Sequence, residues 1–582
     1  MKPLFYLNKF LWNYKKLLLV GSVFIVIANL FALYPAEFVR KAFDSVLLSI
    51  ENNTQSSEEI RNTLLKYGGL IVAFALLKGV FMYFMRQTVI VMSRKIEFDL
   101  KNEIYQQYQN LSMSFYKKNK TGDLMNRISE DVSRVRMYLG PALMYGVNIS
   151  ILFYLVISKM ISISSILTFY ILLPLPILAI TVYFVSSSIN KRSERVQEQL
   201  SQITTISQET FSGIKIVKSF GNEENTWEVF LNSCIVYTKK QLQLVKIEAF
   251  FFPLIITMIG TSSILTIYIG GLESFKGNIT TGNIAEFIIY VNMLAWPVAS
   301  VGWITSIVQR AAASQERIND FLLLKSDIEN KTEALTPITG DINFKDVSLT
   351  YEDTNITALN KVNFSIKEGS TLGVFGKTGS GKSTIANLVC RLYNSTEGTI
   401  SFGNTNIKDL NLFSLRSCIG YIPQDGYLFS GTVKENIAFA SNIIEDEKVI
   451  TAAKKSEILE EINSFSNGFE TIIGERGVQL SGGQRQRLAI ARTFYKEPNL
   501  FIFDDCLSAI DATKEQRILK NLKEESKGKT SIIISHRIAT LKDTDHIIVL
   551  DAGKIIEEGT HNELIKNKGF YFKINQSQSN KI

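Results

Sequence analysis

Two widely separated clusters of residues carry the groups that phosphate chemistry requires. The first is a glycine-rich stretch that ends in a lysine and a serine: Gly376, Lys377, Thr378, Gly379, Ser380, Gly381, Lys382 and Ser383. Glycines let the backbone turn tightly so that its N–H groups converge on phosphate oxygens. We expect Lys382 to reach the β and γ phosphates and Ser383 to offer its hydroxyl to Mg²⁺. The pattern predicts a nucleoside-triphosphate site.

The second cluster is a pair of carboxylates, Asp504 and Asp505, at the end of the apolar run "LFIF". Such a run reads as a buried strand, and a triphosphate site of this kind needs an acid at the end of a separate strand to hold Mg²⁺. We therefore assign Asp504 to the metal, acting through water. The role of Asp505 depends on the wider likeness described below.

The elements needed to position these groups are present in the required order. A buried strand over residues 371–375 enters the glycine-rich stretch, and an amphipathic helix follows it. A dinucleotide-binding loop fits less well because this loop ends in Lys-Ser. From about residue 342 onward, short strand-like runs such as "INFKDVSLTY" are bounded by turn residues. The C-terminal part is thus predicted to be an α/β P-loop domain.

The N-terminal part has the composition of a membrane protein. A spanning helix needs about 20 mostly apolar residues. Six runs of the 582-residue chain meet that need, over residues 17–36, 67–85, 137–157, 161–185, 249–271 and 284–308. We read the first as a retained anchor, since no cleavage site of the A-x-A type follows it. Lys78 interrupts the second run and is expected to snorkel or to face a wet interior.

Charge and cysteine usage agree with a membrane protein that faces the cytoplasm at both ends. The segment before the first run holds four lysines and no acid, so the N-terminus is predicted to be cytoplasmic. The net charge of +8 is explained by orientation and by anionic lipid, and we expect no nucleic-acid partner. All four cysteines fall on the predicted cytoplasmic side, where disulfides are not expected, and their spacing suggests no metal.

Between the two phosphate clusters stands "QLSGGQRQRLAIAR", which resembles the signature loop of the ATP-binding-cassette (ABC) family. The order and spacing of the other motifs agree with this family over almost the whole chain. The resemblance implies that ATP bound by the glycine-rich loop of one cassette contacts the signature loop of another, here Ser481, Gly482, Gly483 and Gln484. One cassette per chain then implies a dimer.

The resemblance assigns further roles in this sequence. It implies that Tyr351 stacks on adenine, that Gln424 touches Mg²⁺ and the attacking water, and that His536 is the γ-phosphate switch histidine. Asp511 is expected to reach across to the second cassette. The cofactors implied are ATP and Mg²⁺, and the activity implied is that of an ATPase coupled to transport.

The order of six spans followed by a cassette resembles the exporter branch of the family, as does "GERG" at residues 474–477. The fold expected is a type I ABC exporter: a membrane α-helical bundle plus an α/β P-loop cassette. We place the membrane domain at residues 1–312, a linker at 313–339, the cassette at 340–575 and a tail at 576–582. Short helices near residues 114–123 and 210–219 are expected to dock on the cassettes.

Asp505 departs from the family pattern, in which the acid after the Mg²⁺ aspartate is Glu and polarises the attacking water. Because misplacing a catalytic group by about 1 Å can cost about a hundredfold, this site should be slow. The likeness is thus to the degenerate-site subunit of heterodimeric bacterial multidrug or lipid exporters, and we favour a heterodimer whose partner carries Glu. A slowly hydrolysing homodimeric lipid flippase and an ATP-binding gating subunit that pumps nothing stay open.

The resemblance implies transport by alternating access across the inner (plasma) membrane. An amphipathic cargo is expected because the spans are rich in apolar and aromatic residues. A drug, a lipid, a lipid-linked sugar and a small peptide all fit this description.

Overall fold

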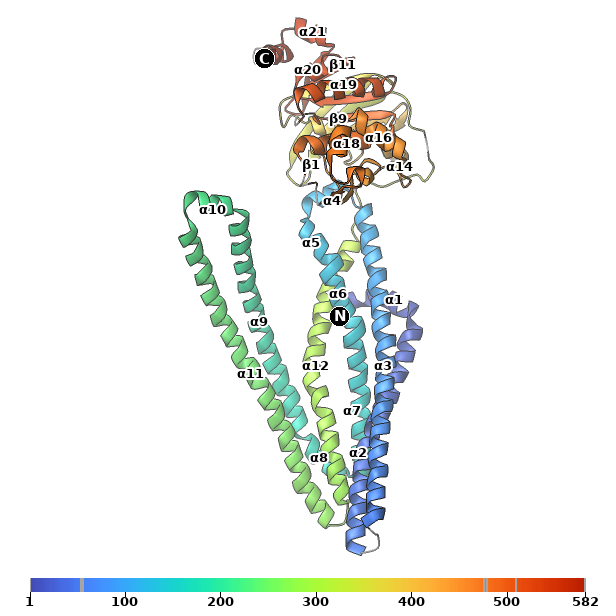
Figure 1. The fold of residues 1–582 in the computed structure, drawn as a ribbon, viewed down its shortest axis with the longest axis vertical. Helices are drawn as coiled ribbons and strands as arrows, with labels where there is room; N and C mark the ends of the chain where they lie inside the picture. The colour runs from blue at the N-terminus through green and yellow to red at the C-terminus, as the bar shows by residue number, and fades with distance from the viewer. Residues whose placement is uncertain are drawn as a thin grey trace. The chain divides into compact units, whose positions relative to one another are not determined.

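A computed structural model of the chain describes residues 2–52, 57–335, 337–474, 477, 480–507 and 510–579 (Figure 1). The chain divides into two compact units. The first holds Met1–Tyr108 and Gly122–Leu323, and the second holds Gln109–Thr121 and Leu324–Ile582. The segment Gln109–Thr121, which interrupts the first unit in sequence, therefore belongs with the C-terminal unit.

The first unit consists of long helices. They are α2 (Lys15–Asn52), α3 (Ser57–Asn110), α7 (Leu143–Ile163), α8 (Ser165–Leu172), α9 (Pro174–Ser212), α11 (Glu223–Phe275) and α12 (Thr281–Leu322). Shorter helices flank or join them: η1 (Lys2–Leu7), α1 (Asn8–Asn13), α5 (Thr121–Asn126), η2 (Arg127–Asp131), α6 (Val132–Met137), η3 (Tyr138–Ala142) and α10 (Ile214–Phe220). Six helical segments of the described chain are long and apolar enough to cross a membrane, which confirms the predicted number of spans.

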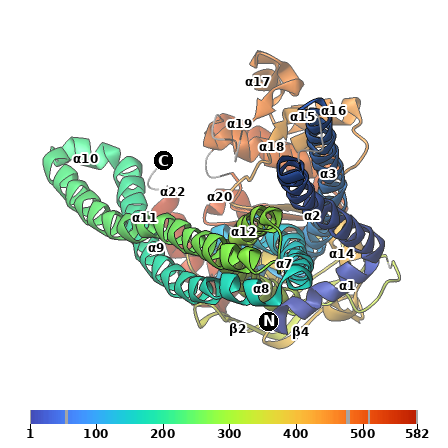
Figure 2. The same cartoon turned by 90° about the horizontal axis from the view of Figure 1, so that it is seen from below.

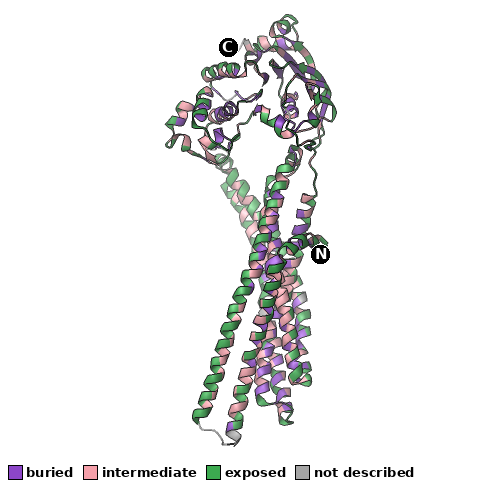
Figure 3. Ribbon diagram, turned by 90° about the vertical axis from the view of Figure 1, so that its right-hand side faces the viewer, coloured by how far each residue is buried: buried purple, intermediate pink, exposed green. Residues whose placement is uncertain are grey.

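The apolar surface of these helices is only partly buried within the chain. Of the most apolar window of α3, 6% is buried, against 47% for α12. Figure 3 shows the exposed residues along α2 and α3, the helices before and after residues 53–56. Helices that are apolar on their outer faces are stable only in lipid or against another subunit.

Helices α9 and α11 lie side by side and are joined through α10 at one end, as Figures 1 and 2 both show. Helix α10 falls where the second short helix was expected. Its apolar side chains are open: Ile216 is 65% exposed and Phe220 82% exposed. Docking of α10 on a cassette stays a prediction.

The second unit is built on two sheets. Its larger sheet has the order β12-β11-β3-β10-β9-β6, and a second sheet has the order β2-β1-β4-β5. The strands of the larger sheet are β3 (Thr371–Gly376), β6 (Ile419–Ile422), β9 (Leu500–Asp504), β10 (Thr530–Ser535), β11 (His546–Asp551) and β12 (Lys554–Gly559). Those of the second are β1 (Ile342–Tyr351), β2 (Ile356–Ile366), β4 (Glu397–Phe402) and β5 (Thr405–Asn406). A short pair joins β7 (Gly431–Thr432) to β8 (Ile472–Ile473).

Helices pack around these sheets in an α/β arrangement. They are α13 (Lys382–Val389), α14 (Leu412–Cys418), α15 (Val433–Ile437), α16 (Asp446–Lys455), α17 (Leu459–Ser464), α18 (Gly482–Lys496), α19 (Ala512–Ser526), α20 (Ile538–Leu541), α21 (His561–Lys566) and α22 (Phe570–Ser579). Strand β9 is buried at every position, as expected for a parallel strand covered on both faces. The observed fold confirms the predicted class, a six-span helical bundle with an α/β cassette.

The register of the large sheet decides where the functional groups meet. Strands β3, β9 and β10 are parallel, with Ile534 opposite Asp504 and Ser535 opposite Phe375. The carboxyl ends of the three strands therefore reach the same edge. This register brings Gly376, Asp504 and the loop after Ser535 together. Ligands of open α/β sheets bind at this edge.

The segment 109–121 carries α4 (Met113–Lys118), which packs on the cassette of its own chain. Ser112 donates a hydrogen bond to Asp327, 3.1 Å away. Lys118 forms an ion pair of 2.7 Å with Glu352. A docked short helix in this region was expected from the sequence, and these contacts confirm it.

Candidate functional site

The glycine-rich loop has the geometry of a phosphate cradle. Gly381 lies in the left-handed region at φ +98°, and a Cβ there would come within 2.3 Å of the Ala358 carbonyl oxygen. A Cβ on Gly376 would lie 2.4 Å from the Leu550 carbonyl oxygen. The hydroxyl of Ser380 is buried and has no hydrogen-bond partner among the described residues. A loop that buries one unsatisfied donor, the Ser380 hydroxyl, suits a ligand rich in acceptors.

Lys382, the first residue of α13, folds over this loop. Its Nζ donates to the carbonyl oxygens of Gly376 and Lys377, each 2.8 Å away. Burial lowers the pKa of the ammonium group, while the nearby carboxylates of Asp505 and Asp504 act in the opposite direction. The loop thus holds a cation next to two acids, where phosphate oxygens can replace the loop carbonyls as acceptors.

Asp504 and Ser383, the two residues that the sequence assigns to Mg²⁺, lie in direct contact. The Ser383 hydroxyl donates to Oδ1 of Asp504 at 2.8 Å, and the Tyr421 hydroxyl donates to Oδ2 at 3.3 Å. Burial raises the pKa of Asp504, and the hydrogen bond from Ser383 acts against this shift. Mg²⁺ prefers carboxylate and hydroxyl oxygens and keeps several waters, so the buried Asp504 carboxylate and the partly buried Ser383 hydroxyl fit the ion.

Asp505 and His536 form a second pair at the same edge. Nδ1 of His536 lies 2.9 Å from Oδ1 and 2.8 Å from Oδ2 of Asp505. The Asp505 N–H donates to the Ile534 carbonyl at 2.9 Å, which ties the residue to β10. Asp505 has φ +47°, in the left-handed region. Both side chains face one cavity of about 600 Å³, which is lined by Phe375, Gly376, Lys377, Thr378, Gln424, Asp505, His536, Phe570 and Ile574.

Other predicted residues lie outside this cavity. The Tyr351 hydroxyl is 3.1 Å from that of Thr384 in the helix after the loop, and Nζ of Lys117 from α4 lies 4.6 Å from the centre of the Tyr351 ring. Ser481 caps α18 and accepts a hydrogen bond from the Gln484 N–H at 3.2 Å. Gly482 and Gly483 form the first turn of that helix. The signature residues do not line the cavity of their own chain.

Helix α18 is nevertheless connected to the cavity. Gln486, on that helix, donates to the Gln424 carbonyl at 3.1 Å.

Asp511 caps α19 by accepting a hydrogen bond from the Lys514 N–H at 3.0 Å. Of the "GERG" motif, Glu475 and Arg476 lie outside the described residues.

Sequence reasoning missed Tyr421 and the wall formed by α22. Tyr421 stands three residues before Gln424 in "YIPQ", and its position in a short apolar run next to a predicted site residue was the available signal. Phe570 and Ile574 of α22 line the cavity, although they are distant in sequence from the other lining residues. No local pattern indicated their place.

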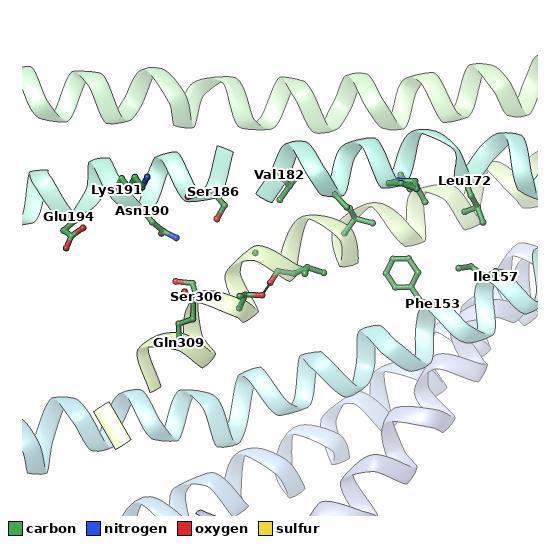
Figure 4. A pocket seen from close by; sticks show the side chains of 18 residues that line it. Phe153, Ile157, Leu172, Val182, Ser186, Asn190, Lys191, Glu194, Ser306 and Gln309 are labelled. Carbon is green, nitrogen blue, oxygen red and sulfur yellow. Dashed lines mark hydrogen bonds between the residues drawn. The ribbon is translucent and has the colours of Figure 1, made fainter. Parts of the chain in front are cut away.

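The membrane unit has a cavity of its own, of about 670 Å³, among α7, α8, α9 and α12 (Figure 4). One end is lined by Phe153, Ile157 and Leu172, and the other by polar residues that include Lys191 and Glu194. Apolar residues thus lie at the level of the predicted spans, and charged ones lie beyond residue 185, where the fourth predicted span ends.

The fold and the two sites together define a class: a multi-pass membrane protein with a P-loop nucleotide-binding cassette fused behind its spans. Two family models match the chain, one described as the ABC transporter transmembrane region over residues 17–298 and one described as ABC transporter over residues 359–508. The chain therefore belongs to the ABC transporter family, with both parts fused in one polypeptide and an ATP-binding ATPase domain.

Curated relatives and a solved structure agree with this assignment. The chain is 32% identical over 570 residues to a probable multidrug resistance ABC transporter ATP-binding/permease protein, YheI of Bacillus subtilis, and the match covers 97% of this chain and 96% of YheI. It is 31% identical over 562 residues to an ATP-dependent lipid A-core flippase of Syntrophus aciditrophicus, covering 96% and 92%. A bacterial Atm1-family ABC exporter with ATP bound has a TM-score of 0.79 at 23% identity, covering 98% of each chain, which shows the shared fold.

Proposed function

We propose that this chain is one half of a dimeric exporter that uses ATP to move an amphipathic compound out of the inner leaflet of the plasma membrane. The observation that carries the proposal is the polarity of the membrane cavity in a chain that also holds a complete phosphate cradle. The N-terminus and the cassette lie in the cytoplasm, as the lysine-rich segment before the first span requires.

We infer the roles of the cassette residues from the family likeness, and their contacts are compatible with these roles. The loop from Gly376 to Ser383 holds the phosphates, with Lys382 turning from the loop carbonyls to the ligand. Ser383, Asp504 and Gln424 would hold Mg²⁺, which would neutralise charge on the phosphate oxygens. Tyr351 stacks on the adenine. Asp505 and His536, which line the same cavity as Gly376 and Lys377, would orient the attacking water and the γ-phosphate.

Dimerisation completes the site. Ser481, Gly482, Gly483 and Gln484 start α18 outside the cavity of their own chain. Their N–H groups at the start of a 15-residue helix suit a phosphate bound by a second cassette. Closure of two such sites would move α4 and α10, and these helices would transmit the movement to the spans. The membrane cavity would then open to the opposite side of the membrane.

The site built on Asp505 is weakened. We therefore favour a heterodimer over a homodimer, with a partner half-transporter that carries Glu at this position. The intact signature of this chain would then serve the competent site of the partner. The same short acid favours a second function, that of an ATP-binding gating subunit that moves no cargo. A slow homodimeric lipid flippase is the third arrangement.

The membrane cavity supports an amphipathic cargo of lipid-like length. From Leu175 to Glu194, both of which line it, α9 advances about 28 Å at 1.5 Å per residue. One leaflet with its headgroups is about 20–22 Å thick. A molecule with an apolar body beside Phe153 and a polar head beside Lys191 and Glu194 would fill the cavity and match its polarity.

The proposal is tested by purifying the full-length chain in lipid, alone and together with a second half-transporter that carries Glu at the position of Asp505. We expect a dimer in both cases, weak ATP turnover by the chain alone and robust turnover by the mixed complex. Robust turnover by the chain alone would remove the case for a partner. A monomer that does not retain MgATP would contradict the proposal as a whole.

A further inference from the structure

Helix α22 forms one wall of the cassette cavity. Phe570 and Ile574, one helical turn apart, line the cavity together with Lys377 and His536. Nζ of Lys377 lies 5.2 Å from the centre of the Phe570 ring. The helix near the C-terminus thus reaches the glycine-rich loop and the switch histidine at the same time.

The first turn of α22 is fixed to the sheet. The Glu557 carboxylate on β12 accepts the N–H groups of Phe570 and Tyr571, the latter at 3.1 Å. The Tyr571 side chain is fully buried, and its ring lies 5.3 Å from that of Phe375, the residue before the glycine-rich loop. His561 anchors the Tyr571 hydroxyl through Nδ1 at 2.9 Å. The start of α22 therefore moves with β3.

The last turn of α22 holds the loop that carries His536. The Gln578 side chain accepts the Ile538 N–H through Oε1 at 3.0 Å and donates from Nε2 to the His536 carbonyl at 2.8 Å. One amide group thus bonds the backbone on both sides of Arg537. Since α20 begins at Ile538, this N–H has no partner within the helix and depends on the side chain.

We propose that Gln578 is a positioning residue for ATP hydrolysis, which sets the place of the His536 imidazole relative to the glycine-rich loop. The inference rests on the proposed role of His536 and Asp505 in that reaction. Helix α22 acts as a strut from Phe375 to His536, so that the two sides of the γ-phosphate site keep their spacing. Without the two bonds, the imidazole would lose its fixed distance from Asp505, while the phosphate contacts of the loop would stay intact.

The test compares Gln578→Leu, which keeps the size of the side chain without its hydrogen bonds, with Gln576→Leu on the exposed part of the same helix. His536→Ala serves as the reference. Each full-length variant in lipid nanodiscs is mixed with labelled MgATP, with the protein in excess over the nucleotide. A single turnover is then measured, which detects hydrolysis even at a slow site. We expect Gln578→Leu to slow hydrolysis about tenfold, below the roughly hundredfold cost of a 1 Å misplacement, with ATP affinity within about twofold.

Two readouts separate positioning from simple loss of structure. Hydrogen exchange of the Ile538 amide should quicken in Gln578→Leu and stay unchanged in Gln576→Leu. Gln578→Glu, which keeps the acceptor and loses the donor, should restore the slow exchange and part of the rate. The inference is overturned if Gln578→Leu matches the unaltered chain while His536→Ala slows hydrolysis, a result that leaves the proposed function standing. It is equally overturned if ATP affinity falls together with the rate.

Discussion

Asp505 places both of its carboxylate oxygens against one nitrogen of His536, at 2.9 and 2.8 Å. The acid that the family uses to polarise water is here one methylene shorter, and the contact holds it against the histidine. Asp505 is also tied to β10 by the hydrogen bond from its N–H to the Ile534 carbonyl. We propose that the shorter side chain and its contact with His536 are the structural cause of slow hydrolysis.

Lengthening this acid should speed hydrolysis. Asp505→Glu moves the carboxylate toward the phosphates, and because about 1 Å of misplacement can cost about a hundredfold, we expect the turnover of ATP by the purified chain to rise by about ten- to a hundredfold. Asp505→Asn, which cannot accept a proton from water, is the control. A turnover rate for Asp505→Glu equal to that of the unaltered chain would show that the short acid is not what limits the site.

The same substitution should reduce stability. Asp505 has φ +47°, a conformation that costs most residues about 1–2 kcal/mol and Asp less. We expect Asp505→Glu to lower the free energy of unfolding of the cassette by about 1 kcal/mol, a fall in Tm of about 2–4 °C. Thermal unfolding of the two variants side by side measures it, and a higher Tm for the glutamate form would refute the argument from strain.

Replacing Asp504, the acid that we propose for Mg²⁺, should have the opposite effects: a gain in stability and a loss of function. Burial raises the pKa of Asp504, so its ionised form destabilises the fold at neutral pH, and the penalty is removed as pH falls through the raised pKa. Asp504→Asn should therefore unfold at a higher temperature at pH 7, with the advantage shrinking on acidification, and should lose Mg²⁺-dependent ATP hydrolysis. Equal Tm values at pH 7 would argue against the burial penalty.

Much of this site was readable from the sequence because its signals are local. The strand, glycine loop and helix around Lys382 form one continuous motif, and Asp504 ends an apolar run, so both were placed correctly at the sheet edge. The six spans follow from composition alone. Tyr421 and Gln578 were missed because their roles depend on β6 lying beside β9 and on α22 returning to the switch loop. Such long-range pairings leave no trace in local spacing.

The membrane cavity predicts a matched pair of substitutions. Ser186 lines the cavity on α9, and the exposed Ser188 on the same helix is not among the lining residues. Ser186→Trp fills the space that we assign to cargo and should lower transport of a fluorescent amphiphile into vesicles at least about tenfold, whereas Ser188→Trp should retain it. Equal transport by both variants would place the cargo elsewhere.

A buried ion pair should be important for the stability of the membrane unit. Glu286 on α12 is fully buried, pairs with Arg40 of α2 at 3.1 Å and accepts from the Tyr290 hydroxyl at 2.7 Å. Removing one partner of a buried pair typically costs about 3–5 kcal/mol, so Arg40→Met should lower the Tm of the detergent-purified chain. The double change Arg40→Met with Glu286→Leu should recover most of the loss. A double variant with the same low Tm as Arg40→Met would show that the loss of stability does not come from leaving Glu286 buried without its partner.

The central claim is that ATP held by the cassette moves an amphipathic molecule through the spans. Its most direct test is transport of a labelled amphiphile into vesicles that contain the purified dimer with its cassettes outward. Transport is measured with and without MgATP, for the unaltered dimer and for a dimer with Lys382→Ala in this chain and the matching lysine-to-alanine change in its partner. The account predicts ATP-dependent accumulation by the unaltered dimer and none by the variant. Accumulation that persists in the Lys382→Ala dimer, or a dimer that binds ATP and moves no amphiphile, would contradict it.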